Sequence, residues 1–430
     1  MLANSKPLNL RRLLVLFVLV LGPLAYGQDA DLNKVLQLPK LKLVTPDRIE
    51  QMNAPEKLAW QTYLEQSNKI AMLDRQQLFS ELKTAGLSKS NPAPSSSVQF
   101  EIASDKHDAA WFRTDEANQL VANLLSFQTP AGGWSKSVDF SKGPRAKGMH
   151  WTNHNGNGWH YCGTLDNRAT TEQIQFLAAH FTATQHMPSR QGAIAGIEWL
   201  LAAQYPTGGW PQVYPLEAGY HEAITLNDGA MQHALEVLTL VAKGSEPFAF
   251  VDASLRQRAQ EAVDRGMDCL LRAQVVIDGQ RTVWCAQHDP IDLQPLAARA
   301  KEPPSLSGAE SADLVKFMMR KADDSPAART MIESAVKWLD ENRVTHIRKI
   351  KNAEGRTDYV ADETSTEVYW ARFYDLKTQK PIFAGGQDGI VYDTFTEMAK
   401  NNKVSYDYYT TRPRDVVTKE LQRWKKRVGL

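Results

Sequence analysis

The apolar positions of the chain follow a helical period over most of its length. Between residues 115 and 342, aliphatic and aromatic side chains return every three or four positions, which is the spacing of one face of an α-helix. The pattern predicts helices at residues 115–128, 169–184, 190–204, 229–242, 255–274, 309–322 and 328–342. From residue 368 onward, short alternating stretches predict minor strands or extended segments. The chain is therefore predicted to be mainly α-helical, with few strands near its C-terminus.

Three of the predicted helices end in the same sequence pattern. Leu-Leu-x-x-Gln begins at residues 124, 200 and 270 and leads to Trp134, Trp210 and Trp284, with Gly-Gly directly before the first two tryptophans. Related segments then open the next helix at 164–167, 225–228 and 305–308. Three copies of outer helix, turn and inner helix predict a closed ring of helix hairpins, since stacked repeats bury a shared core. Such a ring brings the starts of its inner helices to one end.

The first 27 residues have the organisation of a secretory signal. Lys6, Arg11 and Arg12 precede an almost wholly apolar run at 13–21, and Pro23 and a few small residues follow. We expect cleavage and a secreted or periplasmic protein, the alternative being an uncleaved anchor. The formal net charge is +1, and loss of these three cations makes it −2. A nearly neutral mature chain predicts no binding to nucleic acid and none to a membrane after cleavage, and we expect it to be a monomer.

The remainder of the chain divides into two parts by composition. Residues 28–99 predict a helical N-terminal extension that ends in a Ser/Pro-rich linker at 87–98, and residues 100–430 predict the main domain. Three cysteines are too few for a disulfide scaffold in a chain of 430 residues, although one bridge remains open. No cluster of cysteine and histidine has zinc-ligand spacing.

Two acidic residues, Asp166 and Asp228, open two of the predicted inner helices. One interpretation is helix capping, since Asp, Asn and Thr are favoured at helix starts and the helix dipole attracts negative charge. The other is a shared site, because a closed ring would bring both acids to one end, with Asn167 and Asn227 beside them as neutral oxygen donors. Hard oxygen ligands of this kind suit Ca²⁺. We predict that Asp166 and Asp228 are metal ligands and catalytic residues, and that Asn167 binds substrate.

Four further residues are candidates for binding an anionic ligand. Trp134 and Lys136 follow the first Gly-Gly turn, where the lysine could face a ligand and the tryptophan could also be a core residue. His288 is either a hydrogen-bonded structural histidine or part of the site. Arg372 stands among aromatic residues and could bind a carboxylate at two points or stack structurally. We predict Trp134, Lys136 and His288 as substrate-binding residues and Arg372 as a catalytic residue.

Long stretches of the chain resemble family 10 of the polysaccharide lyases, the pectate lyases. The matching segments are GGWSKSVDF, TLDNRATTEQIQFLA, YPTGGWPQVYPL, ITLNDGAM, TVWCAQHDPIDLQPLAARAKEPPSLSGAES and ARFYDLKTQKPIF, which cover most of residues 125–385 in the family's order. The resemblance implies an (α/α)₃ toroid, Ca²⁺ as cofactor, and cleavage of polygalacturonate (pectin) by β-elimination. It implies the calcium and active-centre acids at Asp166 and Asp228 and the substrate-binding arginine at Arg372.

One segment departs from the family pattern. After the Pro-Ile-Phe segment the family has Asp-Arg-Asp-Gly, whose arginine resembles the proton-abstracting base, whereas this chain has Gln387 at the nearest position. Either another cation is the base, or the chain binds pectate and cleaves it poorly; the candidate bases are Arg372, Lys403, Arg412 and Arg414. An arginine base predicts a high pH optimum, because the free pKa of arginine exceeds 12. We expect a secreted pectate lyase. The alternatives are a catalytically impaired homologue that binds pectate and a glycoside hydrolase that uses two carboxylates.

Overall fold

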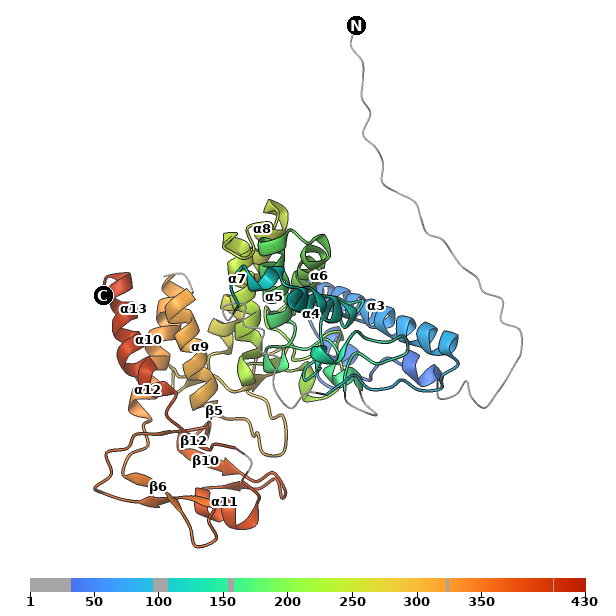
Figure 1. The fold of residues 1–430 in the computed structure, drawn as a ribbon. Helices are drawn as coiled ribbons and strands as arrows, with labels where there is room; N and C mark the ends of the chain where they lie inside the picture. Colours follow the sequence, from blue (N-terminus) through green and yellow to red (C-terminus); the bar gives the residue numbers. More distant parts are fainter. Residues whose placement is uncertain (1–31, 96–106, 154–157, 322–324, 405) are drawn as a thin grey trace.

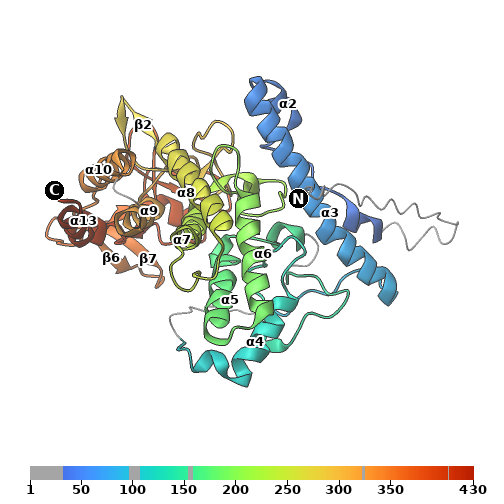
Figure 2. The same ribbon diagram turned by 90° about the horizontal axis from the view of Figure 1, so that it is seen from above.

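The computed structural model describes residues 32–95, 107–153, 158–321, 325–404 and 406–430, so the predicted signal segment lies outside the described residues. Three helix hairpins follow one another, each with an inner and an outer helix (Figures 1 and 2). The hairpins are α5 (Thr171–Thr184) with α6 (Met187–Ala203), α7 (Ala230–Lys243) with α8 (Ala253–Ala273), and α9 (Gly308–Lys321) with α10 (Pro326–Glu341), preceded by α4 (Asp115–Ser126). The predicted mainly α architecture, an (α/α)₃ toroid, is confirmed, and each predicted helix lies within a few residues of its predicted bounds.

Three of the outer helices begin at side chains that cap them. Thr114, Asp252 and Ser325 accept hydrogen bonds from backbone N–H groups in the first turns of α4, α8 and α10, at 3.3, 2.9 and 3.2 Å. Such caps satisfy donors that a helix start leaves unpaired. The inner helices α5 and α7 have no side-chain cap at their N-terminal boundary residues and instead follow short 3₁₀ turns. The starts of α5 and α7 therefore differ from those of these three outer helices, whereas the outer helix α6 also has no side-chain cap and the inner helix α9 is capped by Ser307.

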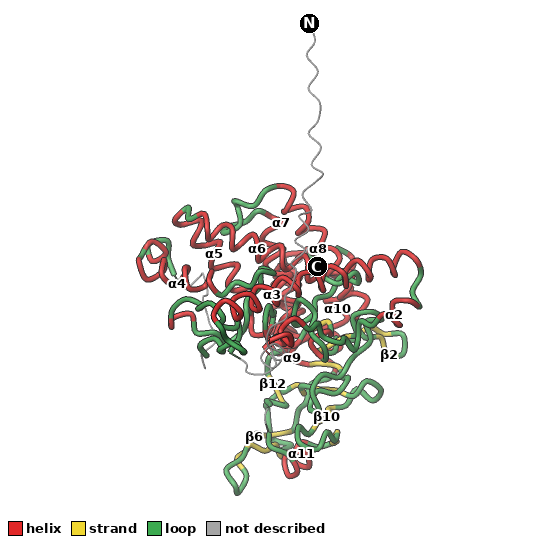
Figure 3. Tube along the Cα trace, turned by 90° about the vertical axis from the view of Figure 1, so that its right-hand side faces the viewer, coloured by secondary structure: helices red, strands yellow, loops and turns green. Residues whose placement is uncertain are grey.

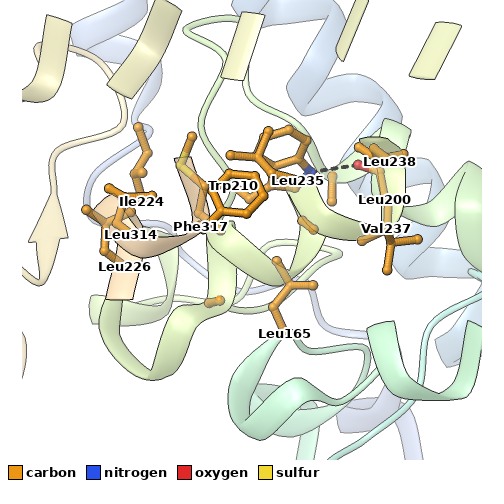
Figure 4. Packing of buried hydrophobic residues seen from close by; sticks show 14 of the residues in the cluster. Leu165, Leu200, Trp210, Ile224, Leu226, Leu235, Val237, Leu238, Leu314 and Phe317 are labelled. Atoms are coloured by element: carbon orange, nitrogen blue, oxygen red, sulfur yellow. Dashed lines mark hydrogen bonds between the residues drawn. The ribbon is translucent and has the colours of Figure 1, made fainter. Parts of the chain in front are cut away.

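The repeated tryptophans close each outer helix onto its following turn. Each indole Nε1 donates to the carbonyl oxygen of the leucine that opens its sequence pattern, at 2.8–2.9 Å. Figure 4 shows this bond between Trp210 and Leu200 among packed residues of α7 and α9. All three tryptophans are fully buried. The repeat seen in the sequence is thus a structural element of the core.

The repeated glutamines connect each outer helix to the next one. Gln204 Nε2 donates to Gly208 O at 2.9 Å and to Ala262 O of α8 at 2.8 Å. Gln128 reaches α6 and Gln274 reaches α10 in the same way. One buried amide per repeat therefore satisfies carbonyl oxygens on two segments and fixes the order of the hairpins.

Glycine is required in the turn before Trp210. Gly208 has a φ of 97°, a conformation that other residues rarely adopt. A Cβ at this position would also lie 2.1 Å from the carbonyl oxygen of Arg265 in α8. The turn therefore packs directly against the backbone of the next outer helix.

Replacing Gln204 by alanine should lower the free energy of unfolding by about 1–3 kcal/mol, because the buried carbonyls of Gly208 and Ala262 lose their donor. The change in Tm on thermal unfolding measures this effect. Gln257→Ala is the matched control, since Gln257 donates to Glu261 on the exposed face of α8. Equal Tm values for the two variants would contradict the connecting role of Gln204.

Short strands form a layer at one end of the helices (Figures 1 and 3). Its largest sheet is antiparallel, with the order β11 (Val391–Tyr392), β10 (Pro381–Ala384), β9 (Phe373–Tyr374) and β5 (Leu306–Ser307). Two-stranded pairs are β1 (Ile224–Thr225) with β4 (Gln287–His288), β2 (Val276–Ile277) with β3 (Gln280–Arg281), β6 (Ile347–Lys351) with β7 (Thr357–Ala361), and β8 (Trp370–Ala371) with β12 (Tyr409–Thr410). Because β5 leads directly into α9, its pairing with β9 brings the segment around Arg372 to the start of an inner helix.

The last helices return from the strand layer to the hairpins. α11 (Phe395–Asn401) packs on β7 and β10 within the layer. α12 (Pro413–Asp415), the π-helical turn η9 (Val416–Glu420) and α13 (Leu421–Val428) then pack beside α9. The C-terminus therefore lies next to the third hairpin, as Figure 1 shows.

The N-terminal segment packs against the hairpins and shares their core. It consists of η1 (Lys34–Leu36), α2 (Pro46–Glu50) and the long helix α3 (Ala54–Ala85). Trp60 and Tyr63 belong to the main hydrophobic cluster, and Tyr63 Oη donates to Ala203 O of α6 at 3.1 Å. Within the predicted linker, Ala93 N donates to Thr152 O at 2.9 Å. The described residues of that linker are thus docked on the main body, and no break in packing separates the two predicted parts there.

Two further observations concern the chain as a whole. Cys162, Cys269 and Cys285 are buried free thiols, so the disulfide that the sequence left open is not formed. No helix among the described residues is both long and apolar enough to cross a bilayer.

Candidate active site

The inner helices α5 and α7 follow two matching turns that carry the predicted acids. The turns are η6 (Asp166–Arg168) and η8 (Asn227–Gly229), which contact each other. The middle residue of each turn is left-handed, with φ of 53° at Asn167 and 52° at Asp228, a conformation that Asn and Asp tolerate. Asp166 is therefore equivalent to Asn227, and Asn167 to Asp228, as the alignment of residues 164–167 with 225–228 indicates, so the two acids are offset by one position. The two acids nevertheless lie in adjacent turns.

The loop after Asp166 is strained and is anchored on Trp134. Thr170 has a φ of 66°, which is unusual for a β-branched residue. Its Oγ1 accepts from Trp134 N at 3.0 Å and donates to Trp134 O at 3.2 Å. The Trp134 side chain is fully buried and its Nε1 is bonded to Leu124 O. The prediction that Trp134 binds substrate is therefore wrong, because the residue has no accessible surface and instead supports the loop that carries Asp166.

Asp166 is paired with the predicted cation Lys136. The Lys136 ammonium donates to Asp166 Oδ2, and it also lies 4.7 Å from the centre of the Tyr161 ring. The side chains of Lys136 and Asp166 are 18% and 11% exposed. The Asp166 carboxylate thus bonds to a neighbouring side chain at the opening instead of serving as a helix cap.

Asp228 lies at the exposed rim beside Asp166. Its Oδ2 accepts from Asn227 Nδ2 at 2.8 Å. Loss of solvent around the carboxylate, followed by the negative charges of Asp166 and Glu310, raises its pKa. The opposing charges of Arg372 and Arg299 lower it less. The charges of two acidic and two basic side chains therefore act on the Asp228 carboxylate.

Arg372 is held at the same opening by two residues of the hairpins. One guanidinium nitrogen, Nη2, donates to Glu310 Oε1 at 2.9 Å and to Asn227 Oδ1 at 3.0 Å. Ser307 caps the start of α9, because its Oγ accepts from Glu310 N at 3.3 Å and its hydroxyl donates to Glu310 Oε2. Glu310 is therefore fixed by the helix cap and in turn orients Arg372.

Arg299 is a member of the site that the sequence analysis did not single out. Its guanidinium donates to Glu302 through Nε at 2.8 Å and through Nη2 at 2.7 Å. Its Cζ lies 5.9 Å from the ring centres of both Tyr220 and Tyr406. Burial raises the pKa of Tyr220 to about 12; the negative charge of Asp166 adds to the rise, and the positive charge of Arg299 opposes it. We call the group of Lys136, Asp166, Asp228, Arg299 and Arg372 the mouth.

His288 lies in the interior and not at the mouth. Its side chain is fully buried, Nδ1 bonds to Leu293 O at 2.8 Å, and Nε2 accepts from Cys285 N at 3.1 Å. Burial lowers its pKa to about 4, which keeps the ring neutral. The prediction of substrate binding by His288 is wrong, since both ring nitrogens are used to fix the backbone of its own loop.

The other candidate bases lie on the strand layer or C-terminal to it. Lys403 is exposed, and its backbone N–H donates to Gln387 Oε1 at 3.1 Å, so Gln387 joins two loops. Arg412 donates to Asp313 Oδ2 at 2.9 Å and Arg414 to Val368 O at 3.1 Å. Of the four candidates, Arg372 bonds to Asn227 and Glu310, and Arg412 lines the same pocket as Asp228 and Glu310.

The donor set of the mouth suits a hard cation only in part. Asp166 and Asp228 provide two carboxylates, and Asn167 and Asp228 line a pocket of about 480 Å³ beside them. Among the described residues, no group of three or more His, Cys, Asp or Glu side chains could hold a metal ion. Two carboxylates fit Ca²⁺ when a ligand and water complete its coordination. An acidic sugar would supply such oxygen atoms.

Comparison with known proteins agrees with the architecture. The family model for pectic acid lyase matches residues 128–417. Two solved structures of the family 10 polysaccharide lyase from Cellvibrio cellulosa are similar, with TM-scores of 0.62 each. One is a point mutant in complex with trigalacturonic acid, at 29% identity over 76% of this chain and 99% of that chain; the other has 30% identity over 76% and 97%. No curated protein matches. This chain belongs to the pectic acid lyase family and is a polysaccharide lyase.

Proposed function

We propose that this chain is a secreted, Ca²⁺-dependent pectate lyase that cleaves polygalacturonate by β-elimination. The observation that carries the proposal is the mouth, where two carboxylates and three cationic side chains are linked by contacts: Lys136 with Asp166, Asn227 with both Asp228 and Arg372, and Tyr406 with both Arg372 and Arg299. Family membership and the relative bound to trigalacturonic acid support the same substrate class. Secretion rests on the predicted signal at residues 1–27.

The cations of the mouth suit the chemistry of a uronate. Its carboxylate is attached to C5, whose proton must leave before the C4–O bond breaks. Lys136 and Arg372 bind this carboxylate in our proposal, and their charge stabilises the negative charge that develops when the proton leaves. Glu310 and Asn227 keep Arg372 in position. In this proposal Lys136 and Arg372 both bind the sugar carboxylate and increase the acidity of the C5 proton.

We assign the role of proton acceptor to Arg299. Its side chain is 45% exposed, whereas that of Arg372 is 16% exposed and is paired with Glu310. The partner of Arg299, Glu302, is 3% exposed and cannot itself reach a substrate. The C5 proton would pass to a neutral guanidine nitrogen of Arg299. The electron pair of the C5–H bond would then form the C4–C5 double bond, and the glycosidic oxygen would leave from C4 and take a proton from water.

Asp166 and Asp228 would hold Ca²⁺ together with oxygen atoms of the substrate and water. When bound, the ion supplies additional stabilisation of charge at the sugar carboxylate. Lys136 holds the Asp166 carboxylate in place before that happens.

The proposal is tested by incubating the purified chain with polygalacturonate, with added Ca²⁺ or with a chelator. We expect unsaturated oligogalacturonides with Ca²⁺ and none with the chelator. Calcium-dependent binding without product at any alkaline pH would instead identify a catalytically impaired homologue that binds pectate. The departure at Gln387 is the observation that favours this second function.

The rate of cleavage should rise with pH between about 7 and 10. Hydrogen bonding to Glu302 raises the pKa of Arg299, so the neutral guanidine is scarce and its fraction grows about tenfold per pH unit below that pKa. Steady-state kcat measured at saturating polygalacturonate and constant ionic strength tests the slope. A rate that is flat or falls over this range would contradict an arginine as the proton acceptor.

A further inference from the structure

Lys301 lies in a tight turn that also carries two residues of the mouth region. Ala298 N donates to Glu302 O at 3.1 Å and Glu302 N donates to Arg299 O at 2.8 Å, which closes the turn. Glu302 fixes Arg299 through two hydrogen bonds. The turn therefore holds Lys301 at a defined distance from Arg299.

Three cations gather around the ring of Tyr406. Lys301 Nζ lies 4.0 Å from its centre, Arg372 Cζ lies 4.3 Å from it, and Arg299 Cζ lies 5.9 Å from it. The Tyr406 hydroxyl donates to Glu302 Oε1 at 2.7 Å, which fixes the ring. Cation–π contacts offset part of the repulsion between the cations. The fold thus concentrates positive charge at one side of the mouth.

Repulsion between these cations affects the pKa of Lys301. Burial, then the positive charge of Arg299, lowers the pKa of the Lys301 ammonium; the charge of Arg372 acts in the same direction, and Glu302 opposes both. A bound anion would relieve this repulsion. The Lys301 side chain also lies against Gly386, where an added Cβ would be 3.4 Å from Lys301 Cδ. Its stem is therefore packed while its half-buried head remains near the opening.

We propose that Lys301 binds a free carboxylate of the uronate chain and so makes the site selective for unesterified galacturonate. The inference rests on the proposed function. Lys301 acts together with Tyr406, whose ring holds it beside Arg372. A methyl ester in place of the carboxylate would remove the charge that Lys301 recognises.

The test compares Lys301→Met and Lys301→Arg, with Lys337→Met as a matched control on the exposed face of α10, where Lys337 pairs with Glu341. KM and kcat are measured on polygalacturonate and on highly methyl-esterified pectin, and Tm is measured for each variant. For Lys301→Met we expect KM on polygalacturonate to rise about tenfold with kcat nearly unchanged, and the preference over esterified pectin to shrink. Lys301→Arg should keep most of the wild-type KM, and Lys337→Met should match the wild type.

The outcomes separate this inference from the proposed function. A wild-type chain without lyase activity would overturn the proposed function. An active wild type with an unchanged KM in Lys301→Met would overturn the role of Lys301 alone. Equal losses of kcat and Tm in Lys301→Met and Lys301→Arg would also overturn it, since they would indicate a packing role.

Discussion

Replacing Asp166 by alanine should lower kcat/KM on polygalacturonate by about 10³-fold, because one change removes a carboxylate of the mouth and the partner of Lys136. Asp166→Asn, which preserves the shape of the side chain, should show a loss of similar size. Calorimetric titration with Ca²⁺ should show weakened binding in both variants.

The controls for Asp166 separate chemistry from stability. Asp268→Ala removes an exposed acid of α8 that pairs with Arg272, and it should leave kcat/KM unchanged. If Asp166 were only a helix cap, its replacement would cost about 1 kcal/mol of stability and activity would be kept. Retained activity in both Asp166 variants would therefore refute its assigned role.

Replacing Arg299 by lysine should lower kcat by roughly 10²-fold or more, because the proton acceptor moves and loses its two-point pair with Glu302. The dependence of kcat on pH should also change. Lysine has a pKa near 10.4, below that of arginine, so the alkaline rise should level off at a lower pH. Full pH profiles of kcat for the wild type and the variant provide the measurement.

The test uses Arg299→Lys and not a neutral substitution, because Glu302 is buried and needs a cationic partner. Removing the cation alone would leave the buried Glu302 carboxylate without its charged partner, which would destabilise the fold. Arg258→Lys is the matched control, since Arg258 forms a similar two-point pair with Glu198 on exposed outer helices. An Arg299→Lys profile with the wild-type shape would show that Arg299 is not the proton acceptor.

The helical body could be predicted because its signals are local and repeated. Apolar spacing gave the bounds of the hairpin helices, and the Leu-Leu-x-x-Gln and Trp repeat gave their order. The pair of acids could also be predicted, because neighbouring repeats necessarily place equivalent turns side by side. The two acids are offset by one position in these turns, and the backbone shows in addition that Asn167 and Asp228 are the left-handed positions.

The missed features depend on contacts between distant segments. Arg299 lies in a loop without periodicity, and only its pairing with Glu302 and its contact with Tyr406 bring it to the mouth. The sequence did offer one indication of Arg299, because the residue lies inside a segment that resembles the pectate lyase family. The wrong predictions of substrate binding by Trp134 and His288 have the same cause. Their polar atoms satisfy buried backbone groups, and no sequence pattern reveals such contacts. The strand pair β6 and β7 was missed because β6 is rich in charged residues and shows no apolar alternation that would mark a strand.

The mass of the products from a short oligogalacturonate in the presence of Ca²⁺ tests the central claim most directly. If the mouth catalyses elimination, the fragment masses add up to that of the parent and one fragment carries an unsaturated end. Fragments that together contain one additional water would instead show hydrolysis by the paired carboxylates and would contradict the account.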